Sequence, residues 1–444
     1  MMNYYKSNYL ILGTRRAAWL SLALAILTIF SLPAEGQKLK LQQSNPSGIY
    51  KPGEQIVISL SAEDQETDSV TVEVFKDFSK QVYAERVAVS SDGEVIYSNT
   101  FPGPAAISCK VTAGEEWAAT GLVVDPENFE PGYARPADFD AFWKREKKAL
   151  RKLKMNVKME PENGEGEGFE CYDTEINCTG PKPARGYFAR PVEADANSLP
   201  IVLLVHAAGV NGDWCKSKPS SALNYARMGK GALCFDLNAH GMLNGMPEAY
   251  YDSLAAGPLH RYFYQGFDRR DDFYFKGMYL RLQRTIDFLT SQPEWDGRRI
   301  IVIGESQGGG QALVAAGLDK RVTAAVATVP AMCDWGGPLA GRKGGWPDPV
   351  NASGNSSEVS EAVSYFDAAH LLKNSRATLF VEIGLIDRTC PSSSIYAAIN
   401  QSKGRKIVYT VPYRGHHLEQ EEFLETWKEE VLRKREDFIR HFLR

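Results

Sequence analysis

The sequence predicts an α/β protein with a doubly wound, mostly parallel sheet, preceded by a small all-β domain. Two patterns predict this organisation. Short β-rich runs separated by turn residues fill residues 39–125, and from about residue 169 onward strand-like apolar runs alternate with helical segments. A length of 444 residues, with 43% hydrophobic and 24% charged residues, is sufficient for more than one folded domain.

Residues 1–36 are expected to be a signal peptide. Basic residues precede the apolar run 17–32, and Ala34-Glu-Gly36 supplies small residues at a cleavage site. The run of 16 residues is shorter than the roughly 18 to 20 that a membrane-spanning helix needs. The mature chain is expected to begin at Gln37 and to be exported, either periplasmic or secreted, with no membrane attachment after cleavage. An uncleaved anchor and a twin-arginine signal stay open as alternatives.

Residues 37–126 are expected to form an accessory β-sandwich of the immunoglobulin type. Turn sequences such as Pro52-Gly53 and Asp92-Gly93 separate its apolar, β-branched runs. The clearest runs are 55–60, 70–75, 81–89 and 106–112. Because this segment contains no histidine and no cluster of catalytic side chains, a packing or spacer role is favoured over carbohydrate binding.

Residues 127–444 are expected to form the catalytic domain. A linker is followed by Asp138, which is expected to cap a helix whose Phe139, Phe142 and Trp143 follow helical spacing. The predicted strands that follow are 169–178, 184–190, 199–205, 231–236, 299–303, 322–329, 377–383 and 406–411. Helices are predicted at 276–291 and after residues 217, 306, 366, 392 and 419. This alternation predicts a mostly parallel sheet covered by helices.

The most informative segment is Gly304-Glu305-Ser306-Gln307-Gly308, which lies between a β-branched strand and an Ala/Leu-rich helical run. Strand, sharp glycine turn and helix together are typical of a nucleophile elbow, in which the serine hydroxyl is exposed above the sheet. Ser306 is therefore the predicted nucleophile of a serine hydrolase. The alternative is a glycine-rich turn with an inactive serine.

A serine hydroxyl needs a base to accept its proton and an acid to orient that base. In this fold class the chain order is serine, acid, histidine, each at a strand end. Asp387 follows the predicted strand 377–383, and His416 follows the predicted strand 406–411, so these two are the expected acid and base. Asp334 and the neighbouring His417 are the alternatives for the two roles.

The oxyanion hole is expected to combine two backbone N–H groups. One is that of Gln307, at the start of the helix after the serine, and the other comes from the small-residue loop after strand 199–205. Ala208 is favoured for the second donor, with Val210 as an alternative. Two histidines at strand ends, His206 and His240, are candidates to border the pocket, together with the loop residue Asn211.

No cofactor and no metal is expected, because the sequence has no cysteine or histidine spacing typical of a metal site. A formal net charge of −4 predicts no nucleic-acid partner and no basic stripe. Seven cysteines leave at least one free thiol, and Cys171 and Cys178 cannot pair because they are expected on opposite faces of one strand.

Five segments, in order along the chain, resemble the acetyl xylan esterase and cephalosporin C deacetylase family of α/β hydrolases. They are Arg135-Pro-Ala-Asp-Phe-Asp-Ala-Phe-Trp143, Lys276-Gly-Met-Tyr-Leu-Arg-Leu-Gln-Arg284, Gly304-Glu-Ser-Gln-Gly-Gly309, Val329-Pro-Ala-Met-Cys-Asp334 and Asp387-Arg-Thr-Cys-Pro391. The resemblance covers about residues 130–420. It implies that Ser306, Asp387 and His416 are the triad and that Gln307 and Ala208 form the oxyanion hole.

The implied reaction is removal of O-acetyl groups from xylan-type or related saccharides through an acyl-enzyme. The resemblance also implies a homo-oligomer, which the added β-rich domain leaves open. Trp335 and Trp346 are candidates to stack on sugar rings, and the Tyr- and Phe-rich insertion 242–275 is expected to cap the pocket.

Two departures from the family pattern, Asn238-Ala-His-Gly241 and His206-Ala-Ala208, lie near the expected pocket; a third is His416-His-Leu-Glu419. The rival hypotheses are a prolyl-oligopeptidase-like serine peptidase and an inactive hydrolase-fold protein that binds carbohydrate.

Overall fold

The computed structural model describes residues 39–62, 69–89, 93–162 and 168–444. The predicted signal peptide lies outside the described residues. Within the described ranges, none of the helices combines the length and the apolar character needed to span a bilayer. All seven cysteines lie in the described part of the chain, and each is buried and free.

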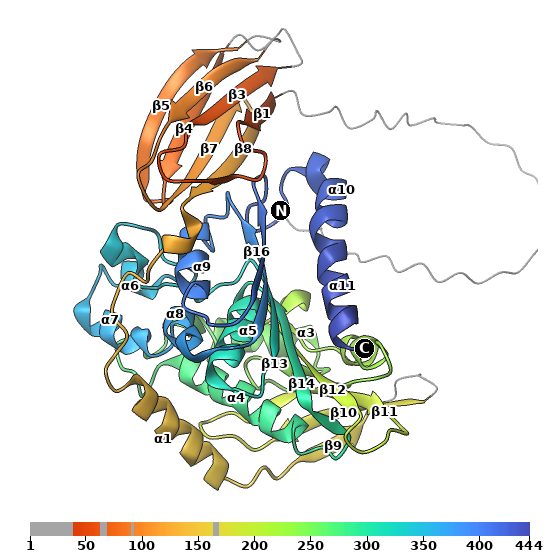
Figure 1. The fold of residues 1–444 in the computed structure, drawn as a ribbon. Coiled ribbons are helices and arrows are strands. Elements are labelled where there is room, and N and C mark those ends of the chain that lie inside the picture. Colours follow the sequence, from red (N-terminus) through yellow and green to blue (C-terminus); the bar gives the residue numbers. More distant parts are fainter. Residues whose placement is uncertain (1–38, 63–68, 90–92, 163–167) are drawn as a thin grey trace, which may run out of the picture. The chain divides into compact units, whose positions relative to one another are not determined.

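The strands between residues 39 and 124 form two sheets, drawn in red and orange in Figure 1. One sheet has the order β1 (Leu39–Gln43), β3 (Ile56–Ala62), β6 (Glu94–Asn99). The other has the order β2 (Ile49–Tyr50), β8 (Glu116–Val124), β7 (Ala105–Ala113), β4 (Ser69–Lys76), β5 (Lys80–Ala88). Alternate residues of β3 and β4 are buried, so the two sheets bury their facing apolar side chains in a common core.

A mixed sheet of nine strands forms the centre of the remaining chain. Its order is β17 (Lys406–Val411), β16 (Thr378–Gly384), β15 (Ala324–Thr328), β14 (Trp295–Glu305), β12 (Leu199–Val205), β13 (Leu233–Asn238), β11 (Ala184–Pro191), β10 (Phe169–Ile176), β9 (Lys158–Pro161). The strands from β17 to β13 are parallel, and β11, β10 and β9 extend the sheet in antiparallel pairs. This is the mostly parallel sheet that the sequence predicted.

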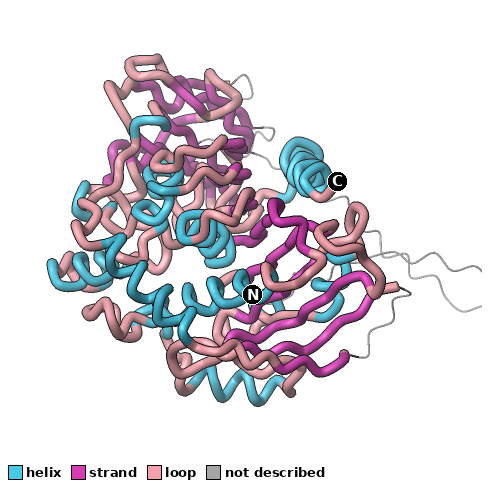
Figure 2. Tube along the Cα trace, turned by 60° about the horizontal axis from the view of Figure 1, so that its bottom comes forward, coloured by secondary structure: helices cyan, strands magenta, loops and turns pink. Residues whose placement is uncertain are grey.

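Helices cover both faces of this sheet, as Figures 1 and 2 show. One face packs against α1 (Phe139–Lys152), α4 (Tyr274–Leu289), α5 (Gln307–Leu318), α8 (Ala368–Leu371) and α9 (Ser392–Ile399). The other packs against α2 (Pro219–Ala226) and α11 (Arg433–Phe442). The other α-helices of the described residues are α3 (Glu248–Ala256), α6 (Pro349–Ala352), α7 (Ser357–Ser364) and α10 (Leu424–Trp427).

Two local expectations were wrong. Asp138 precedes α1, but its carboxylate makes no capping bond; it accepts hydrogen bonds from Arg270 Nη1 at 2.9 Å and from the Tyr365 hydroxyl. Cys178 lies beyond β10, not on it.

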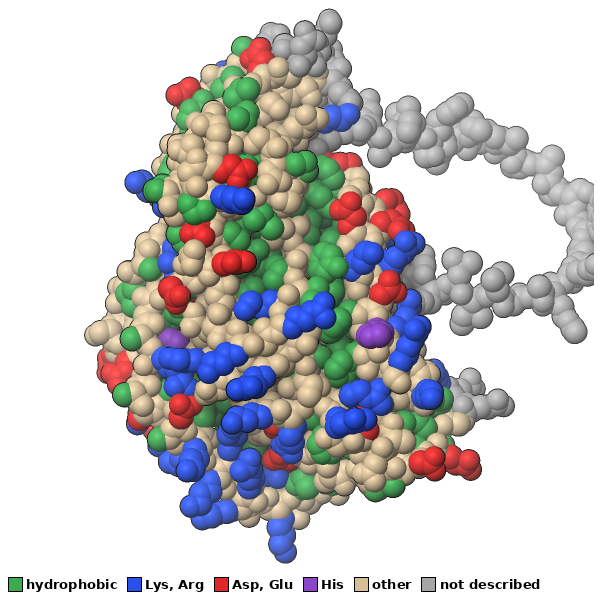
Figure 3. Space-filling model, in the orientation of Figure 1, with side chains coloured by type: hydrophobic (Ala, Val, Ile, Leu, Met, Phe, Trp, Pro, Cys, Tyr) green, Lys and Arg blue, Asp and Glu red, His purple; other side chains and the backbone are tan. Residues whose placement is uncertain are grey.

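The absence of a basic stripe, expected from the net charge, also needs correction. Lysine and arginine side chains gather over α1 on the face in Figure 3. A formal charge summed over the whole chain cannot reveal such a local cluster.

Candidate active site

Ser306 occupies a strained turn between β14 and α5. Its φ of 55° and ψ of −119° are rarely adopted by residues with a side chain. Backbone hydrogen bonds hold the turn: Ser306 N donates to Thr328 O at 2.9 Å, and Ala331 N donates to Ser306 O at 2.9 Å. A Cβ at Gly308 would lie 2.4 Å from Val205 O. Only glycine therefore lets the helix begin this close to the end of β12.

Asp387 and His416 follow the neighbouring parallel strands β16 and β17, whose carboxyl ends lie at the same edge of the sheet as the end of β14. His416 Nε2 lies 2.9 Å from Ser306 Oγ, and His416 Nδ1 lies 2.9 Å from Asp387 Oδ2. Asp387 is fully buried and Ser306 is 8% exposed. The structure thus brings the three predicted side chains together in one hydrogen-bonded chain.

The partners of His416 define its tautomer. A carboxylate oxygen only accepts hydrogen bonds, so the ring hydrogen lies on Nδ1 and Nε2 carries the lone pair that faces the Ser306 hydroxyl. The other carboxylate oxygen, Asp387 Oδ1, accepts from Thr389 N at 2.8 Å and from Cys390 N at 2.9 Å. These two donors fix the orientation of the carboxylate.

The alternative residues lie in other surroundings. His417 is exposed to solvent. Asp334 is fully buried, and its carboxylate accepts hydrogen bonds from Gly132 N at 2.7 Å and from Arg342 Nη2 at 2.8 Å. Both Asp334 oxygens therefore have partners that anchor the segment before α1 and the loop after β15.

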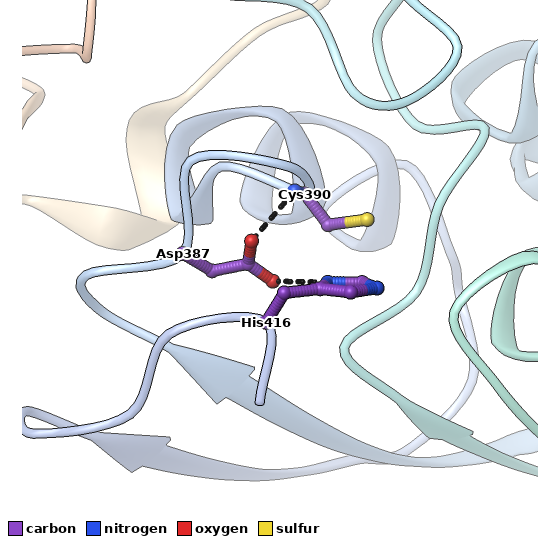
Figure 4. A group of neighbouring side chains, drawn as sticks. All are labelled: Asp387, Cys390 and His416. Carbon is purple, nitrogen blue, oxygen red and sulfur yellow. Dashed lines mark hydrogen bonds and ion pairs between the residues drawn. The ribbon is translucent and has the colours of Figure 1, made fainter. Parts of the chain in front are cut away.

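Cys390 lies beside Asp387 and His416, as Figure 4 shows. One ligand atom from each of the three residues lies within 4.8 Å of the others, which is close enough for a metal ion. Two properties disfavour that use. Burial, and next the charge of Asp387, raise the pKa of the Cys390 thiol well above its usual range, so the thiol keeps its proton. Asp387 also has both oxygens in hydrogen bonds to protein groups.

The two expected oxyanion donors lie on segments that contact each other. Gln307 is the first residue of α5. The loop after β12, which contains Ala208, packs against the same helix, because Gln311 Nε2 donates to His206 O at 3.4 Å. The close approach of Gly308 to the end of β12 brings the two segments together as well.

A cluster of three rings supports these segments. The Tyr262 hydroxyl donates to Gln307 Oε1 at 2.6 Å, and the Tyr262 ring centroid lies 4.4 Å from that of His240. His240 Nε2 lies 2.8 Å from Gly209 O and Nδ1 lies 2.7 Å from the Tyr274 hydroxyl. Burial, and next the nearby arginine of α4, lower the pKa of His240 to about 3. A neutral ring with its hydrogen on Nε2 satisfies both contacts.

His206 and Asn211, two predicted pocket residues, have protein partners. His206 Nε2 contacts the fully buried Asp236 carboxylate. Burial is the largest single influence and would lower the pKa of His206. The charge of Asp236, the hydrogen bond to its carboxylate and a hydrogen bond to the Trp214 backbone together outweigh burial, so that pKa is raised. The Asn211 side chain donates to Asp252 Oδ1 at 2.7 Å, on α3 of the insertion.

The two tryptophans that were expected to stack on sugars differ in exposure. Trp335 is fully buried among the rings of Phe273 and Phe275, so it offers no surface to a sugar. Trp346 is partly exposed and packs against Phe263 of the insertion, with ring centroids 5.1 Å apart.

Trp214 was missed by the sequence analysis. Its side chain is 53% exposed, and its Nε1 donates to Ala208 O at 2.9 Å. A Cβ at Gly212 would lie 2.5 Å from the indole ring. The position of Trp214 two residues after the loop 206–212, which was chosen for the oxyanion hole, could have indicated its place near the site.

The profile of the acetyl xylan esterase family (AXE1) matches residues 125–339 and 348–435. The chain belongs to this family. It is therefore a hydrolase of carboxylic esters with an α/β-hydrolase fold. This finding confirms the resemblance inferred from the motifs and argues against the peptidase alternative.

Named relatives agree with the family. Acetyl esterase Axe7A from Xylanibacter ruminicola is 29% identical over 378 residues, which cover 83% of this chain and 84% of the relative. The solved acetyl xylan esterase from Paenibacillus sp. R4 has a TM-score of 0.56 and 25% identity, covering 70% of this chain and 98% of that one. Acetyl xylan esterase 1 from Thermoanaerobacterium sp. JW/SL YS485 has a TM-score of 0.54 and 21% identity, covering 72% and 98%.

Proposed function

We propose that this esterase removes O-acetyl groups from xylan-type saccharides through an acyl-enzyme on Ser306. The observation that carries the proposal is the continuous chain from Ser306 Oγ through His416 to Asp387, with 2.9 Å at each step. The names of the relatives support an acetyl ester as the substrate.

Each residue has a distinct role in the proposed mechanism. His416 Nε2 accepts the Ser306 proton as Oγ attacks the acetyl carbonyl, and Asp387 stabilises the imidazolium that forms. The N–H groups of Gln307 and Ala208 stabilise the oxyanion, each contributing about 10²- to 10³-fold in rate. His416 then protonates the departing sugar hydroxyl. A water molecule then gives a proton to His416 Nε2 and attacks the acetyl-serine carbonyl. The bond between the acetyl carbon and Ser306 Oγ breaks, His416 returns the proton to Oγ, and acetate is released.

Trp214 is proposed as a stacking surface for a sugar ring near the reacting ester. Its exposed indole donates a hydrogen bond to the carbonyl oxygen of Ala208, the residue whose N–H group is assigned to the oxyanion hole. Trp346, supported by Phe263, is a second candidate, and His206, Asn211 and His240 are assigned to the wall of the pocket.

The triad is tested by comparing single-residue variants on an aryl acetate. His416→Ala is expected to lose activity by about 10³-fold or more, whereas His417→Ala, the matched control, keeps the parental rate. Ser306→Ala should be inactive and should not react with a fluorophosphonate. Parental turnover by Ser306→Ala or His416→Ala would reject the assignment.

The substrate class is tested with acetylated xylan, acetylated pectin and acetylated small sugars. Acetate release is expected to be fastest from acetylated xylan, and saponified samples of each polymer should release none. Peptide amides test the peptidase alternative. A preference for peptide amides over acetylated sugars would reject the proposed substrate.

The immunoglobulin type is proposed for the β-rich region on the basis of its strand order. The three-stranded sheet β1-β3-β6 and the five-stranded sheet β2-β8-β7-β4-β5 match a sandwich in which β2 pairs in parallel with the last strand, β8. Export is proposed from the basic and apolar segment before residue 34. Sequencing the amino terminus of the exported protein should give Gln37.

A further inference from the structure

The β-sandwich contacts the two loops that carry Asp387 and His416. We call these the triad loops and define them as residues 385–390, after β16, and 412–420, after β17. The closest contact involves Gly121 on β8. Its N–H donates to Pro412 O at 2.8 Å, and a Cβ there would lie 2.1 Å from Leu385 O. Because that neighbour is a backbone atom, any larger residue would displace the first triad loop.

Leu385 connects the sandwich with both triad loops. It is fully buried, and a Cβ at Gly48 of the sandwich would lie 2.7 Å from Leu385 Cδ1. Leu385 N donates to Val411 O at 3.0 Å, and the next amide, Ile386 N, donates to Arg414 O at 3.1 Å. A shift of Leu385 is therefore transmitted to Asp387, two residues later, and to the loop that carries His416.

Gln420 makes a second connection through its side chain, which is 4% exposed. Its Oε1 accepts from Ala119 N at 3.2 Å, and its Nε2 donates to Ala119 O at 3.0 Å and to Tyr413 O at 2.9 Å. One amide thus joins the β8 backbone to both ends of the loop around His416. The contact is buried, and its three hydrogen bonds fix the orientation of the Gln420 side chain.

A third contact lies directly beside the catalytic acid. The Arg388 guanidinium lies over the ring of Phe75, on β4 of the sandwich, at 5.1 Å from the ring centroid. Three independent contacts from the sandwich therefore reach residues within four positions of Asp387 or His416.

We propose that the β-sandwich is a positioning element of the active site. Gly121 and Phe75 of the sandwich, together with Gln420 of the second triad loop, hold the triad loops so that Asp387, His416 and Ser306 stay aligned. This inference rests on the proposed triad. A misplacement of about 1 Å in a reacting group costs as much as 10²-fold in rate, so contacts of this kind are sufficient to control catalysis. None of the three positioning residues touches the substrate in this proposal.

The first test uses the full chain and a pair of glycine variants in the sandwich. Gly121→Ala is expected to lower kcat on an aryl acetate by about 10- to 100-fold per active site, with KM changed less than about twofold. Its pH profile of kcat/KM should shift, because the surroundings of His416 change. Gly103→Ala is the matched control, since a Cβ at Gly103 meets nothing within 4 Å. Gly103→Ala should match the parent in kcat, KM and pH profile.

Phe75→Leu and Gln420→Ala serve as second variants in case Gly121→Ala does not fold. Each is expected to lower kcat at least threefold and to shift the pH profile while thermal unfolding stays cooperative. The proposal is overturned if every folded variant keeps the parental kcat and pH profile. That result would leave the triad intact, because the triad is judged separately by Ser306→Ala and His416→Ala.

Discussion

Asp387→Asn is the sharpest test of the geometry at His416. Asp387 Oδ1 accepts from Thr389 N at 2.8 Å and Cys390 N at 2.9 Å, so an asparagine would place its own oxygen there and direct its NH2 group at His416 Nδ1. That nitrogen must then accept, and the ring hydrogen moves to Nε2, which faces Ser306 Oγ. The ring can no longer accept the serine proton. We expect kcat to fall by about 10⁴-fold, equivalent to about 5 kcal/mol of barrier.

The measurement is kcat on an aryl acetate at pH 7, normalised to the protein concentration, with circular dichroism used to check that the variant is folded. Fluorophosphonate labelling is not suitable for counting active sites here, because the label also needs His416 to activate Ser306. Thermal unfolding should change little, because the asparagine keeps both backbone hydrogen bonds. A loss of less than about tenfold would refute the reasoning that the two backbone donors dictate the tautomer of His416.

Three further predictions concern stability and substrate. Trp335→Ala should lower the free energy of unfolding in urea by about 3 to 5 kcal/mol, because Trp335 is fully buried; an unchanged midpoint would contradict its place in the core. Trp214→Ala should raise KM for acetylated xylo-oligosaccharides about two- to tenfold and leave aryl acetate unaffected; equal effects on both would reject sugar stacking. Burial, and next the charge of Asp367, raise the pKa of Asp334 from 3.8 to about 6, so the folded state binds this proton more tightly than the unfolded chain. The unfolding free energy should therefore fall as pH rises from about 4 to about 6, and Asp334→Asn should flatten that slope; an equal slope in both proteins would contradict the pKa shift.

The buried parallel strands were predictable because their sequences are continuous apolar runs. The strand expected at 199–205 matches β12, and the strand expected at 377–383 overlaps the buried β16. The strand β8 was not found, since Ala118, Ala119 and Gly121 have low intrinsic preference for β-structure. Their extended conformation depends on pairing with β7 and on contacts with loops far along the chain.

Part of the candidate site was also predictable from the sequence, and part was not. We selected Ser306, Asp387 and His416 because each follows a predicted strand. The carboxyl ends of parallel strands lie at the same edge of the sheet, and this does not depend on the conformation of the loops. The exposure of Trp214 and the complete burial of Trp335 could not be predicted, because both depend on how loops pack over the sheet. The Tyr262 contact with Gln307 joins segments 45 residues apart, and no local pattern signals it.

The glycines that open α5 have a consequence for the order of folding. Gly308, Gly309 and Gly310 occupy its first turn, where each lowers helix stability by about 1 kcal/mol relative to alanine. A Cβ at Gly310 would lie 2.4 Å from Ala331 O, so the tight packing excludes a better helix former. The first turn of this helix is therefore stable only once β12 and the segment after β15 are already in place. Recovery of ester hydrolysis during refolding should accompany the final kinetic phase, later than the return of most secondary structure.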